Sequence, residues 1–207
     1  GDNQAIAVLN GNSGTFVNLG GNILTIGGNE SPSTFNGVLQ DNNLGGSLRK
    51  IGTQNLTIGA LPSYLGSTTI AGGSLTGLLP VNTPLIIHDG TFQMVMNQTL
   101  KTLEGHGGSI ILGASSTPYN LSIQGDSTPT KYTFTGSIMG GGQFNLGSAA
   151  TTGILELTGN NTYTGNTSIF PGSTLISSIN NLPPNGNITT NGNLIFNQPQ
   201  STAGTFA

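Results

Sequence analysis

The stretch Phe35–Gly59 (FNGVLQDNNLGGSLRKIGTQNLTIG) decides the fold, because it returns as Phe134–Gly159 (FTGSIMGGGQFNLGSAATTGILELTG), about 99 residues later. Beyond it, Tyr64–Leu75 (YLGSTTIAGGSL) matches Tyr163–Leu175 (YTGNTSIFPGSTL) at nearly the same shift. The dipeptide Asn-Gln opens each copy, at residues 3–4, 97–98 and 197–198. A chain that resembles itself at a fixed long period is an array of stacked units, so we interpret it as a solenoid.

The repeats set the expected organisation of the 207 residues. The first copy covers about 3–96, the second about 97–196, and a third begins at about 197–207. We expect residues 1–207 to be a single β-solenoid, a piece of a longer rod. At roughly 20 to 25 residues per coil, each repeat makes roughly four to five coils.

The composition favours small stacked layers and excludes several classes of function. The chain has 34 glycines, no cysteine, no tryptophan and only 5% charged residues, yet 34% of it is hydrophobic. It can therefore bury a core and is not of the disordered class. Only four residues are basic, so the electrostatic attraction that dominates nucleic-acid binding is missing. The missing cysteines fit either a cytosolic protein or an exported bacterial one.

Short β-branched runs separated by turn residues indicate strands throughout. Segments such as Gln54–Ile58 and Gly153–Leu157 alternate like strands, while Gly, Asn and Pro clusters such as residues 41–46 and 182–186 indicate turns. No segment has a helical period longer than two turns. The side chains expected to point inward are Leu24, Ile26, Phe35, Val38, Leu48, Leu56, Ile58, Ile70, Leu75, Ile123, Phe134, Ile138, Leu155, Leu157, Ile169 and Leu175.

The run Leu155–Leu175 (LELTGNNTYTGNTSIFPGSTL) resembles the autotransporter-associated β-strand repeat of Gram-negative surface proteins. The matching features are Leu-Thr-Gly at a strand end, then Asn-Thr-Tyr-Thr-Gly, a polar strand ending in Ile169, and a Pro-Gly turn. The earlier copy, Leu56–Leu75, departs from this pattern at Leu61-Pro62. The resemblance implies a right-handed parallel β-helix, secreted or exposed at the cell surface. It also implies export by a C-terminal outer-membrane β-barrel of the same polypeptide.

Parallel β-helices also include polysaccharide lyases and hydrolases, which need paired carboxylates or a metal site. One neighbourhood of this sequence collects ionisable groups, and the candidates for a metal or acid–base cluster are His88, Asp89, Glu104 and His106. The alternative is that they are solvated turn residues beside Gly90 and Gly105. No nucleophile, phosphate-loop or dinucleotide motif is present, so we expect no catalysis, no cofactor and no resident metal.

Two uneven stretches are candidates for ligand loops. Residues 78–91 could widen a coil or leave it as a loop, and residues 115–131 could form a projecting turn. The side chains singled out in and beside them are Asn82, His88, Asp89, Tyr119, Asp126 and Lys131.

Two further patterns in the sequence are threonine pairs and Asn-X-Ser/Thr matches. Pairs such as Thr162 and Thr164 do not recur at the repeat period, which disfavours an array that binds a glycan or ice surface. Asn-X-Ser/Thr matches are expected by chance in a chain so rich in Asn and Thr; they include those that begin at Asn55, Asn97, Asn120, Asn160, Asn166 and Asn187.

The sequence thus predicts a non-catalytic structural segment of an adhesin-like protein at a Gram-negative cell surface. Its expected work is to act as a folding and export scaffold and as a display stalk. Expected partners are a host surface protein or glycan and further copies of the chain through side-by-side packing. The alternative is a polysaccharide-active or glycan-binding parallel β-helix, favoured if Asp89 and Glu104 converge in a groove.

Overall fold

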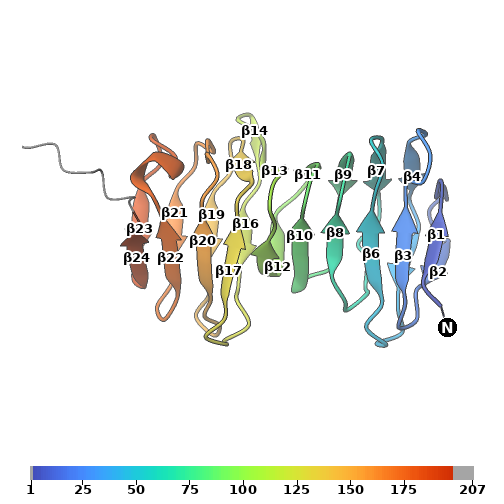
Figure 1. The fold of residues 1–207 in the computed structure, drawn as a ribbon, viewed down its shortest axis with the longest axis horizontal. Helices are drawn as coiled ribbons and strands as arrows, with labels where there is room; N and C mark the ends of the chain where they lie inside the picture. Colours follow the sequence, from blue (N-terminus) through green and yellow to red (C-terminus); the bar gives the residue numbers. More distant parts are fainter. Residues whose placement is uncertain (1, 198–207) are drawn as a thin grey trace, which may run out of the picture.

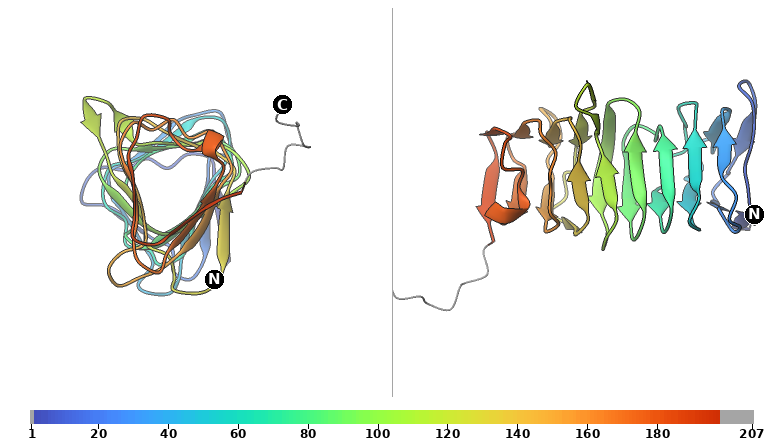
Figure 2. Two further views of the ribbon diagram at one scale, coloured as in Figure 1. Left: turned by 90° about the vertical axis from the view of Figure 1, so that its left-hand side faces the viewer. Right: turned by 90° about the horizontal axis from the view of Figure 1, so that it is seen from above.

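The computed structural model describes residues 2–197 and shows a parallel β-solenoid of ten coils. The coils stack along one axis into a rod (Figure 1). Seen along that axis, the chain winds around a roughly three-sided cross-section (Figure 2). The predicted all-β parallel β-helix is therefore confirmed. At about 4.8 Å per coil, ten coils make a rod about 45 Å long.

Each coil contributes one strand to a ten-strand parallel sheet that runs the length of the rod. Five of these strands fall in residues 3–96 and five in residues 97–196, so each repeat builds five coils. In order, the strands are β1 (Gln4–Ile6), β3 (Ile23–Ile26), β6 (Ser47–Lys50), β8 (Thr68–Ile70), β10 (Thr83–Ile87), β12 (Gln98–Glu104), β16 (Leu121–Ile123), β19 (Phe144–Leu146), β21 (Thr167–Ile169) and β23 (Ile188–Thr190).

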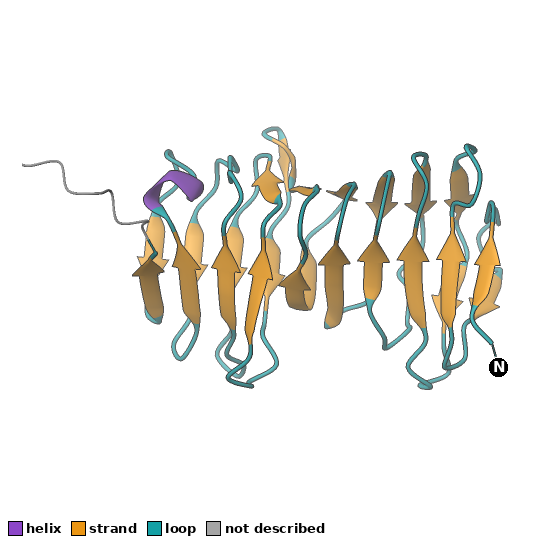
Figure 3. Cartoon of the chain, in the orientation of Figure 1, coloured by secondary structure: helices purple, strands orange, loops and turns teal. Residues whose placement is uncertain are grey.

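The remaining sides of the rod are built from shorter sheets joined by loops (Figure 3). A six-strand sheet contains β4 (Ser33–Phe35), β7 (Asn55–Ile58), β9 (Ser74–Gly77), β11 (Thr91–Met94), β13 (Ser109–Ile111) and β18 (Ser137–Met139). A four-strand sheet contains β17 (Lys131–Phe134), β20 (Ile154–Leu157), β22 (Thr174–Ser177) and β24 (Asn193–Phe196). Two pairs complete the set, namely β2 (Phe16–Asn18) with β5 (Val38–Gln40), and the antiparallel hairpin β14 (Gly113–Ala114) with β15 (Thr117–Pro118).

The only helix among residues 2–197 is the short 3-10 turn η1 (Ile179–Asn181). No helix in this part of the chain is long and apolar enough to cross a membrane. Strands and turns therefore account for the architecture, as the sequence predicts.

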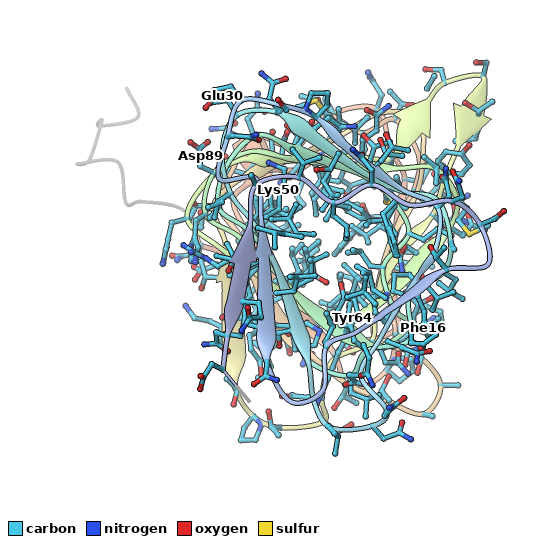
Figure 4. All side chains as sticks on the ribbon, turned by 90° about the vertical axis from the view of Figure 1, so that its right-hand side faces the viewer. Phe16, Glu30, Lys50, Tyr64 and Asp89 are labelled. Carbon is cyan, nitrogen blue, oxygen red and sulfur yellow. The ribbon has the colours of Figure 1, made fainter. Side chains whose placement is uncertain are left out.

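Alternating side chains fill the interior as stacked layers. Leu24, Leu48 and Thr68 lie in register on successive coils, and all three are buried. Every side chain expected inside is buried except Val38, for which that prediction is wrong. Val38 pairs with the exposed Phe16, and Leu39 points inward instead. A slip of one residue along a strand exchanges its two faces, which explains the error. Figure 4 shows Tyr64 directed inward and Phe16 on the outside.

Equivalent residues of the two repeats occupy equivalent places. The Tyr64 hydroxyl bonds the Thr68 hydroxyl at 2.6 Å, and the Tyr163 hydroxyl bonds that of Thr167 at 2.5 Å. All four side chains are buried. The tyrosine-to-threonine bond is thus a repeated element of the core, which satisfies two polar groups that burial would otherwise penalise.

The Asn-Gln opening of each repeat also has a structural role. The Asn3 and Asn97 side chains each accept a hydrogen bond from a backbone N–H of the next coil, Ile23 and Asn120 respectively. In the second copy the buried Gln98 amide makes two bonds to the backbone of Leu79. The third opening, at residues 197–198, reaches the end of the described residues, and the remainder of that copy lies outside them.

Of the two expectations about uneven stretches, the first is wrong and the second holds in part. Residues 78–91 neither widen a coil nor leave it, because they contain β10, and Thr68 pairs with Leu85 only 17 positions later. Within residues 115–131, the projecting part is the β14–β15 hairpin, and β16 follows it as a regular strand. Tyr119 packs against the core, half-buried, and does not project.

We expect Tyr163→Phe to lower the free energy of unfolding by about 1 kcal/mol, because the buried Thr167 hydroxyl loses its partner. Adding Thr167→Val should recover much of the loss, since both groups are then apolar. Urea unfolding followed by circular dichroism measures both variants. Tyr119→Phe is the matched control, and an equal loss there would contradict the assignment.

Candidate functional site at the repeat junction

The ten-strand sheet is irregular at the boundary between the two repeats. Thr83 of β10 pairs with Leu100 of β12, but Leu85 pairs with Leu103, so β12 carries one extra residue. This β-bulge buries two consecutive residues, Thr102 and Leu103. The first half of β12 pairs with β16, whereas Gly105, just after β12, pairs with Phe134 at the end of β17. The strand therefore splits between two sheets.

Gly105 is required where the two sheets diverge. It has a φ of 146°, and a Cβ atom there would lie 1.8 Å from the carbonyl oxygen of Ile87. Only glycine fits a backbone approach this close. Two hollows are lined by residues of this junction.

The first hollow has a volume of about 390 Å³ and contains both histidines of the chain. His88 and His106 stack with ring centroids 6.0 Å apart and planes inclined by 19°. The register that pairs Ile86 with Glu104 places the two rings on neighbouring coils. The full lining is Ile86, His88, Glu104, Gly105, His106, Lys131 and Thr133.

Lys131, at one wall of this hollow, is paired. Its ammonium group lies 2.5 Å from the carboxylate of Glu156, one coil away, and that carboxylate also accepts a bond from Thr133. The ion pair with Lys131 lowers the pKa of Glu156. The Lys131 side chain is half exposed, so the pair adds little stability, and its main effect is to fix the wall of the hollow.

The second hollow, also about 390 Å³, is lined by Asn82, Lys101, Gln124, Gly125, Asp126, Ser127 and Thr151. Asp126 accepts bonds from the hydroxyls of Thr128, at 2.6 Å, and of Tyr132, at 2.7 Å. These bonds, that from Thr128 first, lower the pKa of Asp126 to about 2. The bond to Asp126 is also the main cause that raises the pKa of Tyr132 to about 12. Asp126 is therefore a fixed anion at neutral pH.

We expect Asp126→Asn to lower the pKa of the Tyr132 phenol from about 12 towards its ordinary value of about 10. The carboxylate disfavours loss of the phenol proton, and an amide removes that charge. NMR titration of ring-labelled tyrosine follows the change. Asp89→Asn serves as the matched control and should leave Tyr132 unchanged. A Tyr132 pKa that stays at about 12 in Asp126→Asn would contradict the assignment.

Of the four residues that the sequence grouped as a cluster, the structure brings His88, Glu104 and His106 together in one hollow and leaves Asp89 outside it. Asn82 and Asp126 line the second hollow, and His88, Glu104, His106 and Lys131 line the first. Asp89 lines neither, and its carboxylate accepts a bond from the N–H of Gly90. Of the pair whose convergence would favour an enzyme, Glu104 lines the first hollow and Asp89 lines neither of the two. Among residues 2–197, no three His, Cys, Asp or Glu side chains are grouped so that they could hold a metal ion.

Tyr132 and Glu156 bond residues that line the hollows, but the sequence does not single them out. Glu156 contacts Lys131 from 25 positions away. That separation is about one coil, so a search for charge pairs at coil spacing would have found it. Tyr132 and Asp126 are joined by a loop whose path no spacing rule predicts.

A second feature, the polar strip, covers the outside of the ten-strand sheet in the second repeat. The pairings place Thr99, Ser122, Asn145, Ser168 and Thr189 side by side on five successive coils. Two residues before each of them stand Asn97, Asn120, Gln143, Asn166 and Asn187. Four of the Asn-X-Ser/Thr matches quoted above, those at Asn97, Asn120, Asn166 and Asn187, lie in this strip and so recur at coil spacing.

No family model, curated protein or solved structure matches this chain. The resemblance to the autotransporter-associated repeat therefore stays a prediction based on the quoted residues. The parallel β-solenoid fold rests on the strand pairings themselves.

Proposed function

We propose that this chain is a non-catalytic, rod-forming segment of a secreted or surface-exposed adhesin-like protein of the autotransporter type. The observation that carries the proposal is the unbroken ten-strand sheet, in which the same five-coil unit is used twice. Each coil packs only on its neighbours, so the chain can fold one coil at a time as it emerges. The lack of cysteine suits export through an oxidising compartment.

The scaffold role is tested by export. The full chain is placed between a signal peptide and an outer-membrane β-barrel and expressed in a Gram-negative host. We expect it to reach the cell surface and to resist added protease there. Gly105→Val, which forces a side chain against the Ile87 carbonyl, should reduce surface display. Retention and degradation of the unchanged chain in the periplasm would contradict the proposal.

Side-by-side association of copies is a separate part of the proposal. The six-strand sheet carries outward polar rows such as Asn55, Ser74 and Thr91, which another rod with the same coil spacing could match. Sedimentation velocity over a range of concentrations tests it. A monomer at every concentration would reject association and leave the scaffold role intact.

A further inference from the structure

We propose that the polar strip binds an extended, neutral β-1,4-linked polysaccharide chain lying along the rod. The strip is the two-row array formed by Asn97, Asn120, Gln143, Asn166 and Asn187 with Thr99, Ser122, Asn145, Ser168 and Thr189. The binding surface goes beyond the scaffold role, because a rod can display such a surface or be exported without it.

The spacing of the strip suits a linear polymer. Neighbouring coils are about 4.8 Å apart, and the two rows, two residues apart along each strand, are separated by about 7 Å. Every coil therefore offers one amide and one further amide or hydroxyl at a constant interval. An extended β-linked hexose chain presents hydroxyl-bearing rings at a similar, slightly longer interval, so over the four coil intervals of this short strip one sugar can still face each coil. A bent α-linked chain cannot keep this register.

Most polar groups of the strip are available to a ligand, but the side-chain oxygens of Asn97 and Asn166 each accept a bond from a backbone N–H of the next coil. Thr99, Ser168 and Thr189 make no side-chain hydrogen bond to another described residue, and only Asn145 bonds a neighbour in its row, Ser122, at 3.2 Å. The outward rows of the six-strand sheet differ, because there Ser74 and Thr76 both donate to Asn55. Those hydroxyls already have partners, and the row that contains Thr76 continues through Gln93 into the apolar Ile111 and Met139. The polar strip is therefore the better-prepared surface.

The absence of charge within the strip selects a neutral ligand. None of its ten residues is ionisable, whereas an acidic polysaccharide would require several basic residues. Hydroxyl and amide groups both donate and accept hydrogen bonds, as sugar hydroxyls do. The charged Lys101 follows Thr99 by two residues, and the neutral Gln124 follows Ser122 by two residues. Both line the second hollow, which therefore lies beside one end of the strip. That hollow leaves room for a sugar at one end of the bound chain.

The size of the strip argues against a second copy of the protein as its occupant. Four coil intervals make it about 19 Å long and about 7 Å wide between row centres. This area is far below the roughly 800 Å² that each partner of a stable protein complex buries. It corresponds to a few sugar rings in line.

The test uses cellohexaose and fully N-acetylated chitohexaose as neutral β-1,4-linked probes. Maltohexaose is the bent control, and an oligogalacturonate is the charged control. Isothermal titration calorimetry of the full chain should detect at least one of the first two and neither control. The double variant Asn145→Val and Ser168→Val places β-forming side chains at the centre of the strip. It should keep the fold by circular dichroism and weaken binding about tenfold or more.

A matched control variant, Gln93→Val with Ser109→Val on the six-strand sheet, should bind as the unchanged chain does. The inference is overturned if neither β-linked probe binds, if maltohexaose binds equally well, or if the strip variant binds normally. It is also overturned if sedimentation shows a dimer that the strip variant abolishes while no sugar binds, because the occupant is then a second copy. Export to the cell surface is a separate measurement, so failure of the scaffold role does not affect these outcomes.

Discussion

Phe134→Ala should lower the free energy of unfolding by about 3–5 kcal/mol, the range for removal of a buried aromatic ring. Phe134 is fully buried at the end of β17, where the four-strand sheet begins. Its backbone pairs with Gly105, and a Cβ atom at Gly136 would lie 2.5 Å from its ring. Packing this tight cannot relax to fill the cavity. Urea unfolding measures the loss.

The matched control for this prediction is Phe16→Ala, since Phe16 is 65% exposed and should cost little. Hydrogen exchange adds a spatial test, because a solenoid couples each coil mainly to its neighbours. We expect protection to fall first in the coils around Phe134. Equal losses in the two variants, or a uniform loss of protection along the rod, would contradict this account.

Asp41→Ala should cost about 2–3 kcal/mol, because four backbone N–H groups, one of them on the buried Gly46, lose their charged acceptor. The Asp41 carboxylate is fully buried and accepts bonds from the N–H groups of Asn43, Gly45, Gly46 and Leu65. These bonds hold a turn in which Asn42 and Asn43 adopt positive φ, at 53° and 62°. One carboxylate therefore shapes the corner and joins it to the next coil.

The same carboxylate should make stability depend on acid pH. Burial raises the pKa of Asp41, but the four backbone bonds outweigh it and the pKa is lowered. Its stabilisation is thus fully present above the unfolded-state value of about 3.9 and is lost as pH falls through the lower folded-state value. Asp41→Asn should be less stable at pH 7 and should lose less stability on acidification. Urea unfolding between pH 7 and pH 2 tests this, with the exposed Asp89→Asn as control.

The core could be predicted from the sequence because alternation and the repeat agree. The repeat aligns Phe35 with Phe134 and Leu56 with Leu155, and all four side chains are buried. Lys50 shows where the pattern and the chemistry disagree. It lies in register with Ile26 and Ile70 and is buried, and its ammonium group donates to the carbonyls of Ile51, Gly52 and Gly72. Those carbonyls come from turns, so only the folded corner reveals how the charge is accommodated.

The sites were harder to predict than the core because they depend on the coil period. The threonine pairs do not recur at the 99-residue repeat period. The polar strip recurs instead at about one coil, as in the pairing of Thr99 with Ser122 and of Ser168 with Thr189. Coils vary in length, so no fixed shift aligns them. The hollows lie beside a bulge with one extra residue in β12, which an alternating pattern cannot locate.

The split of β12 has a consequence for valency. The split lies where the last coil of one repeat meets the first coil of the next, and not between two coils of the same repeat. An array in which each such boundary keeps this split would therefore form one pair of hollows at each boundary. Five coils at about 4.8 Å place successive boundaries about 24 Å apart. Sites on a stiff rod at a fixed interval would engage a long ligand together, and weak individual contacts would then act at high effective concentration. Avidity would rise with the number of repeats while each site stayed unchanged.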